Sequence, residues 1–276
     1  MTSIFTSRRR YRRGWHLAAV FGLALAGALP AVAQAPVEVD MWPGIAKDLY
    51  GAKPIAAEDG SVVLEAPVRA EDAALVPLTI RMPSGTAVKT LTLVVEKNPA
   101  PVVASFTFGP AAGTGERKIS TRIRVDMYSN IRAIIETTDG ALHMTTKFVK
   151  AAGGCSAPAL KDADEALASI GKTQLKLLGT EDGAGLREAQ FMIRHPNYSG
   201  MQMNQATGLY IPAKFVDGIE VKRGPDLVFK LEGGISISEN PNIVFTYDPG
   251  HGEPLEVVAK DTDGRVFTAR SIAKGS

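Results

Sequence analysis

Residues 119–127 read Ile-Ser-Thr-Arg-Ile-Arg-Val-Asp-Met, and this stretch decides the fold class. Apolar or β-branched side chains occupy every second position from Ile119 to Met127, and polar side chains lie between them. Successive side chains of a strand point to opposite faces, so a period of two predicts a strand with one buried and one solvated face. The pattern places Arg122 and Arg124 on the solvated face. Strands of this kind are typical of antiparallel sheets.

The same pattern recurs along most of the chain, and only residues 45–50 look helical in the first half. The further strand-like segments are 62–64, 76–80, 91–95, 142–148, 174–178, 189–193, 219–221, 227–231, 243–247 and 255–259. Turn residues separate these segments, and no helices between them would cover a parallel sheet. The sequence therefore predicts an all-β protein of two Ig-like antiparallel β-sandwich domains, joined by a linker with a short helix.

The predicted boundary lies where the alternation stops. Residues 151–158 read Ala-Ala-Gly-Gly-Cys-Ser-Ala-Pro and contain only small side chains. An amphipathic helix over 158–170 would follow, because Pro158 suits a first helical turn and Gly171 suits a helix end. We thus expect one sandwich over 36–152, a Gly-Gly-Cys loop with the linker helix over 153–170, and a second sandwich over 171–276.

The N-terminus resembles an export signal. Five arginines precede the uncharged apolar run of residues 17–29, and Ala31-Val32-Ala33 offers small residues for a signal peptidase. We expect residues 1–33 to be a signal peptide and the protein to be periplasmic. The alternative is that this segment is an uncleaved membrane anchor. Export by the general route and export by the twin-arginine route are both possible. Cleavage would leave 26 basic against 29 acidic residues, a net charge of −3. Nucleic acid is therefore not an expected partner.

Familiar catalytic and cofactor-binding motifs are absent from the sequence. It contains no Cys-x-x-Cys, His-Glu-x-x-His or Gly-x-Ser-x-Gly, and no Gly-rich phosphate loop. We expect a protein that is not an enzyme and has no cofactor and no metal site. One alternative stays open, because Met192, His195, Met201 and Met203 are soft ligands that suit Cu(I).

Cys155 is the only cysteine, so no intrachain disulfide can form. Exported proteins usually use cysteines in pairs. A single cysteine suggests a reactive thiol, a cysteine that pairs with another molecule, or a cysteine without a role. Its small neighbours bury little, so we expect an exposed thiol with a pKa near 8.5. Gly153 and Gly154 would give it a flexible arm. Composition alone leaves two interpretations, a covalent attachment site and an unremarkable linker cysteine.

The first half resembles SoxY, the sulfur-carrier subunit of periplasmic thiosulfate oxidation, and the second resembles its partner SoxZ. The SoxY-like segments are Trp42-Pro43, Leu49-Tyr50-Gly51, Leu64-Glu65-Ala66-Pro67, Ala70-Glu71-Asp72, Val76-Pro77, Glu96 to Pro101, Ser120 to Arg124, and Gly153-Gly154-Cys155. The SoxZ-like segments are Ile193-Arg194-His195-Pro196, Gly200, Thr207-Gly208, Ile211-Pro212-Ala213, Gly233 to Ser236, Glu239-Asn240-Pro241, and Asp261 with Asp263-Gly264.

The resemblance implies a SoxYZ-like carrier protein in one polypeptide, similar to those associated with quinoprotein (PQQ) dehydrogenases. Carried over, Cys155 is the covalent attachment residue, and Gly153 with Gly154 forms the flexible arm. A sulfur intermediate would be held on the thiol for partner redox enzymes: a quinoprotein dehydrogenase, a c-type cytochrome or sulfur-oxidation enzymes. SoxY ends in Gly-Gly-Cys-Gly-Gly, whereas here Ser156-Ala157-Pro158 and another domain follow. The alternatives are a non-covalent adaptor for such a partner, or the Met/His copper-binding protein.

Overall fold

The computed structural model describes residues 40–158, 168–178 and 185–271, and these ranges are nearly all β-structure. The elements are α1 (Trp42–Tyr50), β1 (Ile55–Ala57), β2 (Val63–Glu65), β3 (Val76–Met82), β4 (Val88–Val95), β5 (Val102–Phe108), η1 (Pro110–Ala112), β6 (Arg117–Ile123), β7 (Ser129–Thr137), β8 (Leu142–Val149), β9 (Thr173–Leu178), β10 (Arg187–Ile193), β11 (Val216–Arg223), β12 (Asp226–Gly233), β13 (Asn242–Tyr247), β14 (Leu255–Asp261) and β15 (Val266–Arg270). The predicted all-β class is confirmed. The predicted signal peptide and most of the linker helix lie outside the described residues.

Two sheets contain all the strands of the described residues. One has the order β1-β8-β7-β4-β5-β12-β11-β14-β15, and the other has the order β2-β3-β6-β13-β10-β9. Pairing is antiparallel except for the short β1–β8 pair. The one-sided burial of β3, where buried and more exposed residues alternate, matches the periodicity in the sequence.

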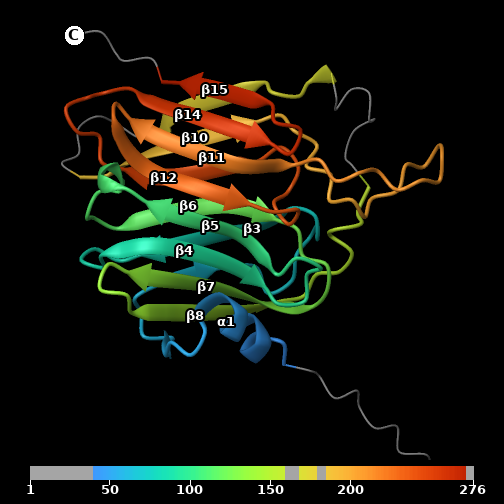
Figure 1. The fold of residues 1–276 in the computed structure, drawn as a ribbon, viewed down its shortest axis with the longest axis horizontal. Coiled ribbons are helices and arrows are strands. Elements are labelled where there is room, and N and C mark those ends of the chain that lie inside the picture. The colour runs from blue at the N-terminus through green and yellow to red at the C-terminus, as the bar shows by residue number, and fades with distance from the viewer. Residues whose placement is uncertain (1–39, 159–167, 179–184, 272–276) are drawn as a thin grey trace, which may run out of the picture. The chain divides into compact units, whose positions relative to one another are not determined.

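The two halves of the chain share both sheets. We call residues 40–158 the first half and residues 168–271 the second half. Strand β5 pairs with β12, and β6 pairs with β13, so each sheet runs from one half into the other (Figure 1). This pairing covers strand edges that would otherwise expose unpaired backbone groups. The described residues of both halves accordingly belong to one compact unit.

Aromatic side chains from both halves meet in the core between the sheets. The rings of Phe106 on β5 and Phe229 on β12 have centroids 5.6 Å apart, and Phe229 meets Phe245 on β13 edge-to-face at 5.1 Å. Edge-to-face contact is a favoured geometry for aromatic pairs. One buried apolar cluster therefore extends through both halves.

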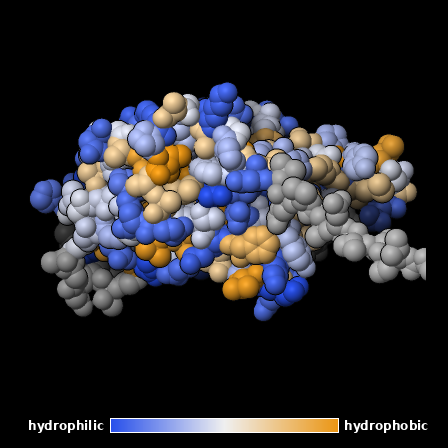
Figure 2. Space-filling model, turned by 90° about the horizontal axis from the view of Figure 1, so that it is seen from below, coloured by the Kyte–Doolittle hydropathy of each residue, from blue (hydrophilic) through white to orange (hydrophobic). Residues whose placement is uncertain are grey.

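Helix α1 covers the outer face of the larger sheet. Trp42, Ile45 and Tyr50 pack on a small buried cluster that includes Ile134 of β7. The guanidinium of Arg132 lies 4.4 Å from the Trp42 ring centroid, a cation–π contact, and pairs with the buried carboxylate of Glu96. The molecular face drawn in Figure 2 has small apolar patches that polar side chains separate from one another.

A hairpin projects from the second half between β10 and β11 (Figure 1). Isolated bridges join Tyr198 to Lys214 and Met203 to Tyr210. The N–H of Tyr198 donates to the carbonyl of Lys214 at 2.8 Å at the base of the projection, and further out the N–H of Ile211 donates to the carbonyl of Gln202 at 2.8 Å. The backbone hydrogen bonds give this long connection a defined shape.

Candidate functional site

The backbone around Gly153 and Gly154 is tightly held. The N–H of Gly153 donates to the carbonyl of Asp126 at 2.7 Å, and the N–H of Gly154 donates to the carbonyl of Val125 at 3.1 Å. A Cβ added to Gly154 would lie 2.1 Å from the carbonyl oxygen of Ala73, far inside an ordinary contact. Gly153 has a φ of +77°, which glycine adopts without strain. Here the glycines allow close approach and a tight turn, so the expected flexible arm is instead a held loop.

The side chain of Cys155 is completely buried, which corrects the expectation of an exposed thiol. Its N–H donates to the carboxylate of Asp126 at 3.2 Å. Burial raises the pKa of the Cys155 thiol to about 12, the negative charge of Asp126 adds to the rise, and Arg124 opposes it. Because the thiolate is the nucleophile, Cys155 is unreactive in this conformation.

Residues 151–158, which we name the carrier loop, are held from the second half by two side chains. The hydroxyl of Ser199 donates to the carbonyl of Cys155, and Nε2 of Gln202 donates to the carbonyl of Ala157 at 3.0 Å. Oε1 of Gln202 accepts from the backbone N–H of Ser199 at 3.1 Å, which orients the Gln202 side chain, and the Ser199 hydroxyl accepts from the N–H of Met201 at 3.2 Å. These contacts bring together residues more than forty positions apart.

Arg124 also holds the carrier loop, and it is 1% exposed. Its guanidinium donates to the carbonyls of Gly154 at 3.1 Å and Asn197 at 3.3 Å, so it links the carrier loop to the second half. Within the described part of the chain, its Nε has no hydrogen-bond partner. Burial lowers the pKa of Arg124, and the nearby negative charges of Glu239 and Asp72 oppose this shift.

The periodicity that begins at Ile119 wrongly predicts Arg124 on the solvated face. Strand β6 ends at Ile123, and the N–H of Arg124 donates to the carbonyl of Ser236 instead of continuing the ladder with β3. Met127, predicted on the apolar face, is 55% exposed. The alternation in the sequence continues beyond the strand, and nothing local marks the change.

Asn98 fixes the segment that carries Arg124 and Asp126, and sequence reasoning did not select it. Its buried amide donates to the carbonyl of Arg124 at 2.8 Å and to Ser236 at 2.9 Å, and its oxygen accepts from the N–H of Asp126 at 2.8 Å. A buried Asn with both ends paired holds backbone in place because breaking it leaves buried polar groups unpaired. In the sequence, only its position in a SoxY-like segment indicated that Asn98 could matter to the site.

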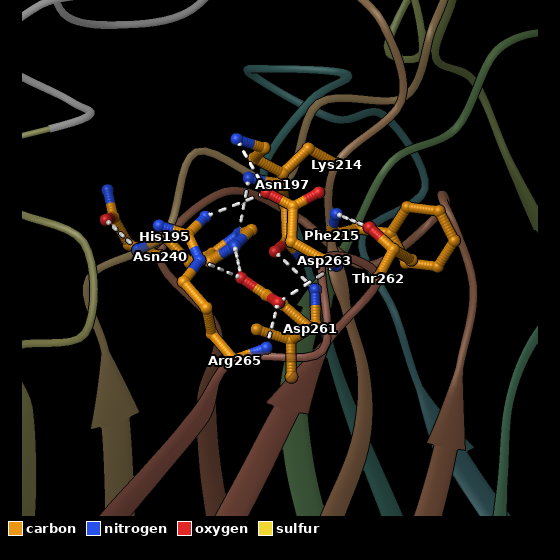
Figure 3. A network of polar contacts seen from close by, with 10 residues as sticks. His195, Asn197, Lys214, Phe215, Asn240, Asp261, Thr262, Asp263 and Arg265 are labelled. Carbon is orange, nitrogen blue, oxygen red and sulfur yellow. Dashed lines mark hydrogen bonds and ion pairs between the residues drawn. The ribbon is translucent and has the colours of Figure 1, made fainter.

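His195 and Asp261, from the two ends of the SoxZ-like pattern, form a buried pair (Figure 3). His195 Nε2 lies 3.4 Å from the Asp261 carboxylate, and its Nδ1 accepts from the N–H of Asn197 at 3.1 Å. Arg265 also pairs with Asp261, at 2.9 Å. Burial lowers the pKa of His195, against the opposing effects of the hydrogen bonds to Asn197 and Asp261. The network anchors the segment that leads to Ser199.

The described residues give the copper hypothesis little support. Both ring nitrogens of His195 are engaged, so a metal would have to displace one partner. Met192 lies on β10, half-buried, whereas Met203 is exposed on the projecting hairpin and Met201 is half-buried. No group of three or more His, Cys, Asp or Glu suited to a metal occurs within 40–158, 168–178 and 185–271.

Each half of the chain matches a known protein family. Residues 46–155 match the family described as sulfur oxidation protein SoxY, and residues 179–271 match sulphur oxidation protein SoxZ. The chain therefore belongs to these families, as a SoxY domain followed by a SoxZ domain in one polypeptide. No curated protein sequence matches the chain. No helix in the described part of the chain is long and apolar enough to cross a membrane.

Among solved structures, the sulfur carrier protein SoxY from Chlorobium limicola f thiosulfatophilum is similar, with a TM-score of 0.35 and 24% identity over 40% of this chain and 96% of that one. A beta-glycosidase from Bacteroides vulgatus has a TM-score of 0.22 and 10% identity, over 79% of this chain and 24% of that one. A beta-glucuronidase from Parabacteroides merdae has a TM-score of 0.23 and 11% identity, over 77% of this chain and 24% of that one. These TM-scores carry no argument, so the family rests on the two sequence matches.

Proposed function

We propose that this protein is a periplasmic carrier that holds an oxidised sulfur group covalently on Cys155 and presents it to partner redox enzymes. One observation carries the proposal: the SoxY match ends on Cys155, which is the only cysteine of the chain. The carrier has no turnover of its own, and its partners supply the chemistry. Residues 1–33, as a signal peptide, would direct it to the periplasm.

Loading with thiosulfate would be an oxidative coupling. The sulfur atom of Cys155 forms a bond to the outer sulfur of thiosulfate, the S–H bond breaks, and one proton and two electrons leave. A c-type cytochrome partner is the proposed acceptor of those electrons. Because the thiol is buried and its pKa is raised to about 12, the carrier loop must open before this step.

The partner need not belong to a thiosulfate pathway. SoxYZ-like single chains resemble carriers associated with quinoprotein dehydrogenases, so we propose such a dehydrogenase or its cytochrome as a second class of partner. Affinity capture with the tagged protein from its native periplasm tests this, with identification of the bound proteins by mass spectrometry. Recovery of sulfur-oxidation enzymes without a quinoprotein would rule the dehydrogenase out.

The burial of Cys155 favours one rival, a non-covalent adaptor in which the thiol has only a structural role. The two proposals differ in what Cys155→Ser does. The adaptor predicts unchanged partner binding and unchanged pathway activity, whereas the carrier predicts unchanged binding with pathway activity lost. Serine is the matched replacement because it keeps the size of the buried side chain almost the same.

Intact-mass spectrometry of the protein purified from its native host tests the carrier directly. We expect a mass increase of a sulfur-containing group that a reductant removes and that Cys155→Ser lacks. A clean thiol in protein taken from cells that are actively oxidising a sulfur substrate would contradict the carrier.

A further inference from the structure

Four side chains hold the carrier loop: the carboxylate of Asp126 accepts from the N–H of Cys155, and the other three donate to backbone carbonyls. Arg124 donates to Gly154, Ser199 to Cys155, and Gln202 to Ala157. None of these contacts involves the sulfur atom, so each can be removed without altering the thiol. Hydrogen bonds of this kind contribute modestly one by one, and together they favour one position of the loop.

In the closed position the sulfur lies in a closely packed interior. Cys155 is fully buried, and the backbone beside it is so close to Ala73 that even a methyl group on Gly154 would overlap. Protein interiors are packed at the density of organic crystals and do not yield space for added atoms without rearrangement. A thiosulfonate on Cys155 adds a sulfur atom and a charged sulfonate group, which burial would also strip of water.

From these two observations we infer that the carrier loop is a load-dependent latch, closed on the SoxZ domain when Cys155 is empty and held open when Cys155 carries cargo. The inference rests on the carrier role proposed above. A ligand shifts an equilibrium by its differential affinity for the two states, and cargo that fits only the open state shifts it fully.

The latch has two consequences for function. The empty thiol is protected from adventitious oxidation, because a buried thiol is largely unionised. Opening also frees Ser199, Gln202 and the guanidinium of Arg124 from the carrier loop. A partner enzyme that contacts these freed groups would distinguish a loaded carrier from an empty one.

Alkylation of the folded protein with iodoacetamide tests the closed state. Ser199→Ala and Gln202→Ala each remove one contact with the carrier loop, and we expect each to increase the alkylation rate of Cys155 roughly fivefold. Ser156→Ala is the matched control, because the Ser156 hydroxyl donates only to Gly153 within the carrier loop itself. Its rate should stay that of the unaltered protein. Equal rates in all four proteins would overturn the latch.

Tetrathionate tests the effect of cargo without any partner enzyme. The Cys155 thiolate attacks a central sulfur of tetrathionate, the central S–S bond breaks, thiosulfate leaves, and a thiosulfonate remains on Cys155. Hydrogen exchange of residues 151–158 and 197–202 should become faster after loading and return to its original rate after reduction. Unchanged exchange in protein shown by mass to be loaded would refute the inference and leave the carrier role standing. If exchange becomes faster after tetrathionate loading but protein from cells never carries a sulfur group, only the carrier role is refuted.

Discussion

Substitution Gly154→Ala probes the closed carrier loop most severely. The new Cβ would lie 2.1 Å from the carbonyl oxygen of Ala73 and 2.6 Å from that of Val125, where an ordinary contact is 3.4 Å or more. Both obstacles are backbone atoms, and Ala73 is itself tied by a 2.9 Å hydrogen bond from Val125. Neither neighbour can move aside, so the loop must move instead.

The energetic cost of this substitution comes from steric overlap and from broken hydrogen bonds. Overpacking of this kind costs about 1–3 kcal/mol. Moving Gly154 also breaks its hydrogen bonds with Val125 and Arg124, at about 1 kcal/mol each. The total is about 4 kcal/mol against closure, which shifts the open-to-closed ratio nearly a thousandfold at about 1.4 kcal/mol per factor of ten.

Alkylation of Cys155 at pH 8 measures this shift. An exposed thiol with a pKa of about 8.5 is roughly one quarter ionised at pH 8, whereas a thiol with a pKa of about 12 is ionised in about one molecule in ten thousand. The closed loop thus protects the thiol by about two-thousandfold, and the nearly thousandfold shift caused by Gly154→Ala should remove most of that protection. Gly153→Ala is the milder companion, since its Cβ meets no clash and only the φ of +77° opposes it, by about 1–2 kcal/mol.

The reasoning fails if Gly154→Ala, shown to be folded by its urea-unfolding transition, is alkylated at the rate of the unaltered protein. It fails equally if the unaltered protein is alkylated as fast as a free thiol. The expected order of rates is Gly154→Ala, then Gly153→Ala, then the unaltered protein.

Three further predictions concern stability and metal binding. Because the pKa of Cys155 is raised, the folded state retains a proton that the unfolded chain loses, and the free energy of unfolding should fall from about pH 8.5 towards pH 12. At pH 10 the loss is about 2 kcal/mol, which urea unfolding measures. The variant Cys155→Ser should not show this loss. Asp261→Ala removes the carboxylate that pairs with buried His195 and with Arg265, which keeps its second partner Asp263. It should destabilise the fold by about 2–4 kcal/mol in the same assay, whereas exposed Asp217→Ala should not. Titration calorimetry with Cu(I) should show no site that His195→Ala abolishes, because both ring nitrogens are occupied.

Much of the sheet structure was predictable because burial on one face leaves a local pattern. Alternation identified β3, β6 and β10, whose outer faces are less buried than their inner faces. It did not identify β7, where Ile134 and Ile135 are adjacent and both buried. Helix α1 covers the outer face at that point, so the strand is apolar on both sides and loses its period of two.

The amino-acid sequence by itself determined that the chain is all-β, that it has one thiol, and that this thiol follows two glycines at the end of a SoxY-like pattern. These properties depend on residue types and short spacings, which can be read directly from the sequence. Only the tertiary structure decided that Cys155 is buried, that Arg124 reaches the carrier loop, and that Ser199 and Gln202 hold it. Burial of a small-residue segment depends on what packs over it, and here the covering residues come from strand ends and a hairpin that are distant in sequence. Local composition contains no record of such contacts.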